Sequence, residues 1–225
     1  MCLIIHKPKG VDVPLELLRS AIHYNRDGFG VMAFSGRQTL TVKRHRKACL
    51  ASLYRIYHSV AEHECVIHLR LKTRGNVTVK NLHPFRVAPK VYMAHNGTLD
   101  VPCRIEGRSD SWHAANDYMA PILQKDPGIL HDQEFLGQLE NWIGPDNRLV
   151  FMDAHQGKTV IVNRNKGIEF NGLWLSNTRW FDADRFGLPQ QERIMPGVQA
   201  LPLTPPPFLK PQTDVSLNRQ IICGH

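Results

Sequence analysis

The chain of 225 residues is 42% hydrophobic and 21% charged, which suits one globular domain with a sizeable core. No apolar run approaches the length of a membrane span, no secretory leader opens the sequence, and no two of the five cysteines form a CxxC pair. We therefore expect no membrane-spanning helix, no disulfide framework and no zinc knuckle. These features favour a cytoplasmic protein.

Short apolar stretches alternate with helical patterns in the first third of the chain. Asp12 and Pro14 are typical of a helix N-cap and first turn, and Gly36 is typical of a turn between two strands. The expected elements are a strand at 2–6, a helix at 12–24, strands at 28–34 and 40–43, a helix at 48–62 and a strand at 65–69.

Residues 70–90 are polar and rich in turn formers, so we expect one or two functional loops there. Ser109 and Asp132 are candidate N-caps of helices that end near Gln124 and Ile143. The other expected elements are a strand at 91–94, which stops at Asn96-Gly97, and strands at 149–154, 159–162 and 172–176 in an antiparallel meander with a turn at 163–166.

Strands flank the helical part of the sequence without a regular βαβ alternation, which predicts an α+β fold with antiparallel sheets and helices packed on them. Seven prolines follow Phe186, and such a segment is typically extended. We therefore divide the chain into a domain at 1–185 and a Pro-rich C-terminal tail at 186–225.

Cys2 opens the first apolar stretch, and four groups of motif residues follow it. Each group alone has a structural explanation, because Asn-Gly pairs form turns, Ser-Asp-Ser caps helices, and two glycines are too few for a dinucleotide fingerprint. The motifs are NRDGFG at 25–30, HLRLKTRG at 68–75 with NLHPF at 81–85, AHNGTL at 94–99 and SDS at 109–111.

Taken in this order behind Cys2, the motifs resemble the class II glutamine amidotransferases of the N-terminal nucleophile (Ntn) hydrolase superfamily. The resemblance spans residues 2–180 and is closest to stand-alone glutaminase-type members, whose chains begin with Met-Cys. It implies a four-layer αββα sandwich, with two antiparallel sheets between helices. It also implies that Met1 is removed, so that Cys2 carries a free α-amine.

The resemblance assigns catalytic roles to three residues. Cys2 attacks the side-chain carbonyl of glutamine and forms a thioester, and its own α-amine accepts the thiol proton through a water near neutral pH. The side-chain amide of Asn96 and the backbone N–H of Gly97 stabilise the oxyanion. No separate histidine base is required, and neither a metal nor a cofactor is expected.

Substrate binding is assigned by the same resemblance to Arg70, Thr73 and Asp110. A guanidinium can bind the α-carboxylate of glutamine with two hydrogen bonds, and a carboxylate can receive its α-ammonium. Thr73 belongs to the segment that closes over glutamine in the family.

Two positions of that closing segment depart from the family pattern. Lys72 and Arg74 stand where related sequences often carry Ala and His, which leaves the specificity of the segment open. Arg26 and Gly28, in the first motif, are expected to support the strand that carries the nucleophile.

The expected function is a glutaminase or amidotransferase that gives glutamate and ammonia, the ammonia passing to a separate synthetase partner. A hydrolase of γ-glutamyl amides or peptides is the nearest alternative. A non-enzymatic nucleic-acid-binding module on the same scaffold is a third hypothesis, because residues 1–90 hold 16 Lys and Arg against 5 Asp and Glu. No basic run with interleaved aromatic residues accompanies this charge, so nucleic acid is not the expected partner.

Overall fold

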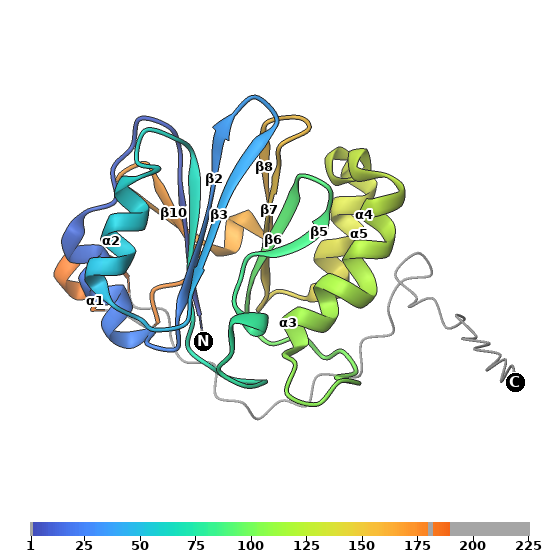
Figure 1. Cartoon of the computed structure of the whole chain (residues 1–225), viewed down its shortest axis with the longest axis horizontal. Coiled ribbons are helices and arrows are strands. Elements are labelled where there is room, and N and C mark those ends of the chain that lie inside the picture. The colour runs from blue at the N-terminus through green and yellow to red at the C-terminus, as the bar shows by residue number, and fades with distance from the viewer. Residues whose placement is uncertain (1, 180–181, 190–225) are drawn as a thin grey trace, which may run out of the picture.

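The computed structural model describes residues 2–179 and 182–189 and contains two antiparallel sheets that face each other (Figure 1). Helices cover the outer side of each sheet. This arrangement is the α+β, four-layer sandwich that the sequence predicts. Residues 190–225, most of the predicted tail at 186–225, lie outside the described residues, so the extended conformation of the tail and the domain boundary stay predictions.

The larger sheet contains six strands in the order β3-β2-β4-β1-β10-β9. In that order, the bounds of the strands are Thr39–His45, Phe29–Gly36, Cys65–Leu69, Leu3–Lys7, Leu173–Leu175 and Ile168–Phe170. β1 lies inside the sheet and pairs antiparallel with both β4 and β10. The first residues of the chain are therefore held from two sides.

The smaller sheet contains four strands in the order β5-β6-β7-β8. Their bounds are Phe85–Ala88, Val91–Asn96, Arg148–Asp153 and Lys158–Val162. The predicted meander over residues 149–176 is wrong, because β7 and β8 belong to this sheet whereas β9 and β10 belong to the larger one. This change of sheet places the end of β10 beside the start of β1.

Two sets of helices form the outer layers. Helices α1 (Leu15–Tyr24) and α2 (Leu50–His58) pack on the larger sheet. The smaller sheet is covered by α3 (Asp110–His113), a π-helical segment (Ala114–Met119), α4 (Ala120–Lys125) and α5 (Gln133–Ile143). No helix of the described residues is long and apolar enough to cross a membrane.

Two of the three predicted N-caps are confirmed. Ser109 Oγ accepts a backbone N–H of the first turn of α3 at 3.1 Å, and Asp132 Oδ1 does the same for α5 at 2.7 Å. The prediction for Asp12 is wrong, because α1 begins after Pro14 and no side chain caps it. The Asp12 carboxylate instead accepts a hydrogen bond from the Tyr57 hydroxyl at 3.4 Å.

Three apolar cores separate the four layers. In β1, Leu3 and Ile5 pack under α1 and α2, whereas Ile4 faces the smaller sheet. Ile4 is fully buried, which contributes about 1.5–3 kcal/mol to stability. The core between the sheets also contains Met32, Val66, Ala94, Val150, Met152 and Trp174. Because β1 is buried on both faces, packing fixes the strand and with it the position of Cys2 at its start.

The sequence does not predict β5 or β9. Both strands are short, with four and three residues, and β5 lies in the polar region that was expected to form only loops. Helix α2 also ends at His58, four residues before the expected end. These differences leave the arrangement of the predicted site unchanged.

Candidate active site

The residues singled out by the motifs converge at one end of the sandwich, where the start of β1 and helix α3 lie (Figure 1). The register that pairs Leu3 with Leu69 brings Cys2 beside Arg70, the residue that follows β4. Asp110 is the first residue of α3, and its charge, like that of Arg70, acts on the Cys2 thiol.

The segment after β10 joins the start of β1 to the end of β6. Ser176 Oγ lies 2.9 Å from the backbone nitrogen of Ile4 and 2.8 Å from Asn96 Nδ2. Asn177 Nδ2 donates to the carbonyl oxygen of Cys2 at 2.9 Å. Asn96 is therefore linked through Ser176 to the start of β1. The sequence motifs do not point to Ser176 or Asn177.

The half-buried Cys2 thiol lies in an environment that favours its protonated form. Its Sγ is 3.7 Å from the carbonyl oxygen of Leu71. Burial raises the pKa of the thiol; the positive charge of Arg70 opposes this rise and the negative charge of Asp110 adds to it. A thiol with a raised pKa is mostly protonated at neutral pH, so its attack on a carbonyl needs a nearby base.

Gly97 lies where the structure has no room for a side chain. Its φ is +138°, which L-residues rarely adopt, and a Cβ there would lie 2.1 Å from Asn147 Oδ1. Asn147 is itself fixed, because its Nδ2 donates to the Ile143 carbonyl and its Oδ1 lies 2.9 Å from His95 Nε2. The missing side chain thus lets the backbone after β6 approach Asn147 closely.

Three buried histidines lie behind the site. His95 Nδ1 is 2.7 Å from Ser111 Oγ, and His68 Nε2 is 3.1 Å from the carbonyl oxygen of His95, which links the two sheets. The rings of His68 and His83 are 4.0 Å apart. Burial lowers the pKa of His68 to about 3, and it also lowers the pKa values of His83 and His95.

All three rings are therefore neutral at physiological pH. Since Asn147 Oδ1 can only accept, His95 carries its proton on Nε2 and accepts from the Ser111 hydroxyl at Nδ1. The histidines hold the sheets and the end of β6 in place without adding charge to the site.

Arg70 and Asp110 present opposite charges that do not form an ion pair with each other in the described part of the chain. Both residues are about 3% exposed. The Arg70 guanidinium donates to the carbonyl oxygens of Asn76 and Arg74, at 3.1 and 3.2 Å. Asp110 Oδ2 accepts the backbone N–H of Leu99 at 2.7 Å. Neutral backbone groups thus hold both charges in place.

The segment at 71–78, in which Thr73 is exposed, is fastened to the rest of the site by Asn81. Asn81 Nδ2 donates to the carbonyl oxygens of Asn76 and Gly107, at 2.9 and 2.7 Å, and its Oδ1 accepts the Ser109 N–H at 3.1 Å. The NLHPF motif does not by itself predict a role for Asn81. Asn81 connects the predicted closing segment to the N-terminus of α3.

The turn at 25–28 contacts the residues after β4 more directly than it contacts β1. The Gly28 carbonyl accepts the Arg70 N–H at 2.9 Å, and Asp27 Oδ2 accepts the Lys72 N–H at 2.7 Å. Arg26 is exposed. Gly28 thus supports β1 only through β4, and Asp27, to which no role was assigned, positions the start of the closing segment.

A sequence model of the class-II glutamine amidotransferases matches residues 14–136, more than half of the chain. The chain belongs to this family. The matched residues include Arg70, Asn96, Gly97 and Asp110 but not Cys2. The family match therefore confirms the predicted resemblance.

Among solved structures, this amidotransferase-family chain is similar to a glutamine aminotransferase class-II domain protein from Silicibacter pomeroyi, with 16% identity and a TM-score of 0.35 over 68% of this chain and 73% of that one. It is also similar to glutamine phosphoribosylpyrophosphate amidotransferase from B. subtilis, with 13% identity and a TM-score of 0.37 over 78% of this chain and 41% of that one. A comparison with curated proteins finds no match.

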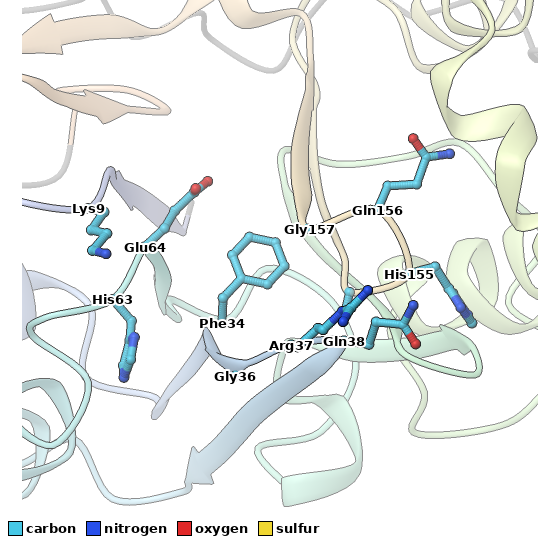
Figure 2. A pocket seen from close by; sticks show the side chains of 11 residues that line it. Lys9, Phe34, Gly36, Arg37, Gln38, His63, Glu64, His155, Gln156 and Gly157 are labelled. Atoms are coloured by element: carbon cyan, nitrogen blue, oxygen red, sulfur yellow. The ribbon is translucent and has the colours of Figure 1, made fainter.

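A separate hollow of about 550 Å³ (Figure 2) lies by the β2–β3 turn, at the end of the sandwich opposite the start of β1 (Figure 1). The β2–β3 turn, the residues before β4 and the β7–β8 turn line it, and it contains none of the predicted site residues. Cys2, Cys49, Cys65 and Cys103 are free. Within residues 2–179 and 182–189, no group of three or more His, Cys, Asp or Glu side chains could hold a metal ion.

Proposed function

We propose that this member of the class-II glutamine amidotransferases hydrolyses the side-chain amide of glutamine through a Cys2 thioester, giving glutamate and ammonia. The observation that carries the proposal is the meeting of Cys2, Arg70, Asn96 and Asp110 at one end of the sandwich. These residues supply a nucleophile, an amide donor and two opposite charges, which are the groups that the reaction needs.

The chemistry begins with removal of Met1, which leaves Cys2 with a free α-amine. An α-amine has an ordinary pKa of about 7.7–8.0, so its neutral form can take the thiol proton, through a water, near neutral pH. The raised pKa of the Cys2 thiol makes such a base necessary. The sulfur then bonds to the amide carbon, and the carbonyl oxygen becomes negative.

The side-chain amide of Asn96 and the backbone N–H of Gly97 stabilise that oxyanion, each donor being worth about 2.7–4 kcal/mol. When the intermediate collapses, the C–N bond breaks and the nitrogen leaves as ammonia with the proton held by the α-amine. Water then attacks the thioester carbon through a second oxyanion, which releases glutamate and restores the thiol.

The two buried charges select the amino-acid end of the substrate. Arg70 binds the α-carboxylate and Asp110 binds the α-ammonium, so that glutamine bridges charges that do not pair with each other. Thr73 lies on the exposed segment beside Arg70 and contributes to closure over the substrate. This clamp reads only the amino-acid end, so a γ-glutamyl amide or peptide would be held in the same way.

Glutamine hydrolysis in this family feeds amide transfer, and we propose that a separate synthetase accepts the ammonia. Copurification from the native host, followed by identification of a partner that makes a C–N bond, tests this part of the proposal. A chain that releases free ammonia at full rate without any partner favours the alternative, a stand-alone γ-glutamyl hydrolase.

The proposal as a whole is tested by incubating the purified protein with glutamine and measuring glutamate and ammonia together. Equal amounts of both are expected from the processed protein, and none from Cys2→Ala. The matched control is Cys49→Ala, which removes a free cysteine that is not one of the proposed site residues. This variant is expected to retain activity. A protein that keeps Met1 and is fully active contradicts the role of the α-amine.

A further inference from the structure

The buried hydroxyl of Ser176 has more hydrogen-bond donors around it than it has lone pairs to accept them. Ser176 Oγ is fully buried and lies 2.9 Å from the Ile4 backbone nitrogen, 2.8 Å from Asn96 Nδ2 and 3.3 Å from Asn177 Nδ2. A hydroxyl oxygen has two lone pairs and one proton of its own to donate. Three N–H groups therefore compete for two lone pairs, and no described acceptor takes the hydroxyl proton.

Asn96 has the complementary imbalance. Its Oδ1 is buried and has no hydrogen-bond partner in the described part of the chain. The oxygen and nitrogen of a side-chain amide have nearly the same shape, so hydrogen-bond partners decide which of two orientations is populated. Turning the Asn96 amide by 180° would place Oδ1 at 2.8 Å from Ser176 Oγ, where it can accept the hydroxyl proton.

That orientation satisfies the hydrogen-bonding capacity of Ser176 completely. Ser176 then accepts from Ile4 and Asn177 and donates to Asn96, which uses all of its capacity. Asn96 Nδ2 then takes the buried position of the former Oδ1, which receives no hydrogen bond from any described N–H or O–H group. A buried donor without a partner costs about 1–3 kcal/mol, which a negatively charged oxygen bound at that point would offset.

We propose that Ser176 is a positioning residue for the oxyanion site: its hydroxyl donates to Asn96 Oδ1 and so directs Asn96 Nδ2 toward the developing oxyanion. The inference rests on the proposed function and adds a residue that the family match at 14–136 does not reach. Ser176 is suited to this task because its backbone N–H pairs with the Ile4 carbonyl at 2.9 Å. The hydroxyl is thereby fixed relative to the strand that carries Cys2.

The kinetic test compares Ser176→Ala with Thr159→Val, which removes a hydroxyl that bonds Glu64 on the far side of the sandwich. In Ser176→Ala, Asn96 stays present but loses its orientation, so kcat is expected to fall roughly 10–100-fold, less than the 10²–10³-fold loss for deletion of a donor. KM for glutamine and the rate of Cys2 alkylation by iodoacetamide stay unchanged. The Thr159→Val variant keeps its kcat.

The proposal is overturned if the Ser176→Ala protein is folded and keeps the kcat of Thr159→Val. It is also overturned if Ser176→Ala lowers kcat and the rate of Cys2 alkylation by the same factor, because the loss would then lie at the nucleophile. Neutron diffraction from wild-type crystals tests the same point without activity or substitution. A deuteron on Ser176 Oγ directed at Asn96 is the expected result, and two deuterons on the Asn96 atom nearest Ser176 contradict it. If the wild-type protein does not hydrolyse glutamine, the proposed function fails, while the neutron result still decides the orientation.

Discussion

Replacing Gly97 with alanine tests whether the backbone after β6 is as constrained as its geometry indicates. The new Cβ would lie 2.1 Å from Asn147 Oδ1, far inside van der Waals contact, at a φ of +138°. Relief requires Asn147 to move, which breaks its 2.9 Å contact with His95. The substitution therefore strains the backbone and disturbs a buried hydrogen bond at once.

The two effects can be assigned magnitudes. A non-glycine residue in such a backbone conformation costs about 1–3 kcal/mol, and a buried polar group left without its partner costs about 1–3 kcal/mol. Gly97→Ala should thus lower the free energy of unfolding by about 2–6 kcal/mol, a large fraction of the roughly 5–15 kcal/mol typical of a domain. Because Gly97 N–H is a proposed oxyanion donor, kcat should also fall about 10²–10³-fold.

Urea denaturation and glutamine turnover measure these effects, with Gly137→Ala as the control. Gly137 lies in α5 with nothing within 4 Å of an added Cβ, so alanine there should stabilise the helix by up to about 1 kcal/mol and leave turnover unchanged. Adding Asn147→Ala to Gly97→Ala removes the side-chain atoms that clash, at 2.1 and 2.8 Å, and leaves the Asn147 Cα at 3.0 Å, so the two losses should not add fully. A Gly97→Ala protein as stable and active as the wild type would show that the backbone at Gly97 is not constrained in this way.

Acid should destabilise the protein, because burial lowers the pKa of His68 to about 3 and also lowers those of His83 and His95. The unfolded chain then binds more protons below its ordinary histidine pKa of about 6.5, and the free energy of unfolding falls by up to about 1.4 kcal/mol per pH unit for each histidine. Equal urea midpoints at pH 7 and pH 5 contradict this. Asp110→Asn should keep the hydrogen bond from the Leu99 N–H but lose the negative charge, so KM for glutamine should rise. Turnover of glutaramate, which lacks the α-amine, should stay the same. An equal change for both substrates contradicts the contact between Asp110 and the α-ammonium.

Much of the fold could be predicted because its elements obey local rules. β4 is a short, mostly apolar stretch, and Ser109 and Asp132 cap helices through hydrogen bonds to the first turn. Asp12 does not cap α1, because the helix begins only after Pro14. The Asp12 carboxylate instead accepts a hydrogen bond from the Tyr57 hydroxyl.

Which sheet a short strand joins was not predictable from its own residues. β9 and β10 have three residues each, and nothing in them shows that they leave β7 and β8 for the larger sheet. The same limit applies to the site. Arg70, Asn96 and Asp110 stand in recognisable motifs, whereas Ser176 and Asn177 follow β10 and reach the site only because β10 pairs with β1.

In the proposed mechanism, Cys2 carries the γ-glutamyl group during turnover. The most direct measurement is acid quenching of the protein during reaction with glutamine, followed by mass spectrometry of the intact chain and of its N-terminal peptide. We predict a chain that lacks Met1 and bears one γ-glutamyl group, lost on treatment with hydroxylamine, on Cys2. Turnover with the group on another cysteine would contradict the Cys2 mechanism. So would the absence of a covalent intermediate under conditions where ammonia is released in a burst ahead of glutamate.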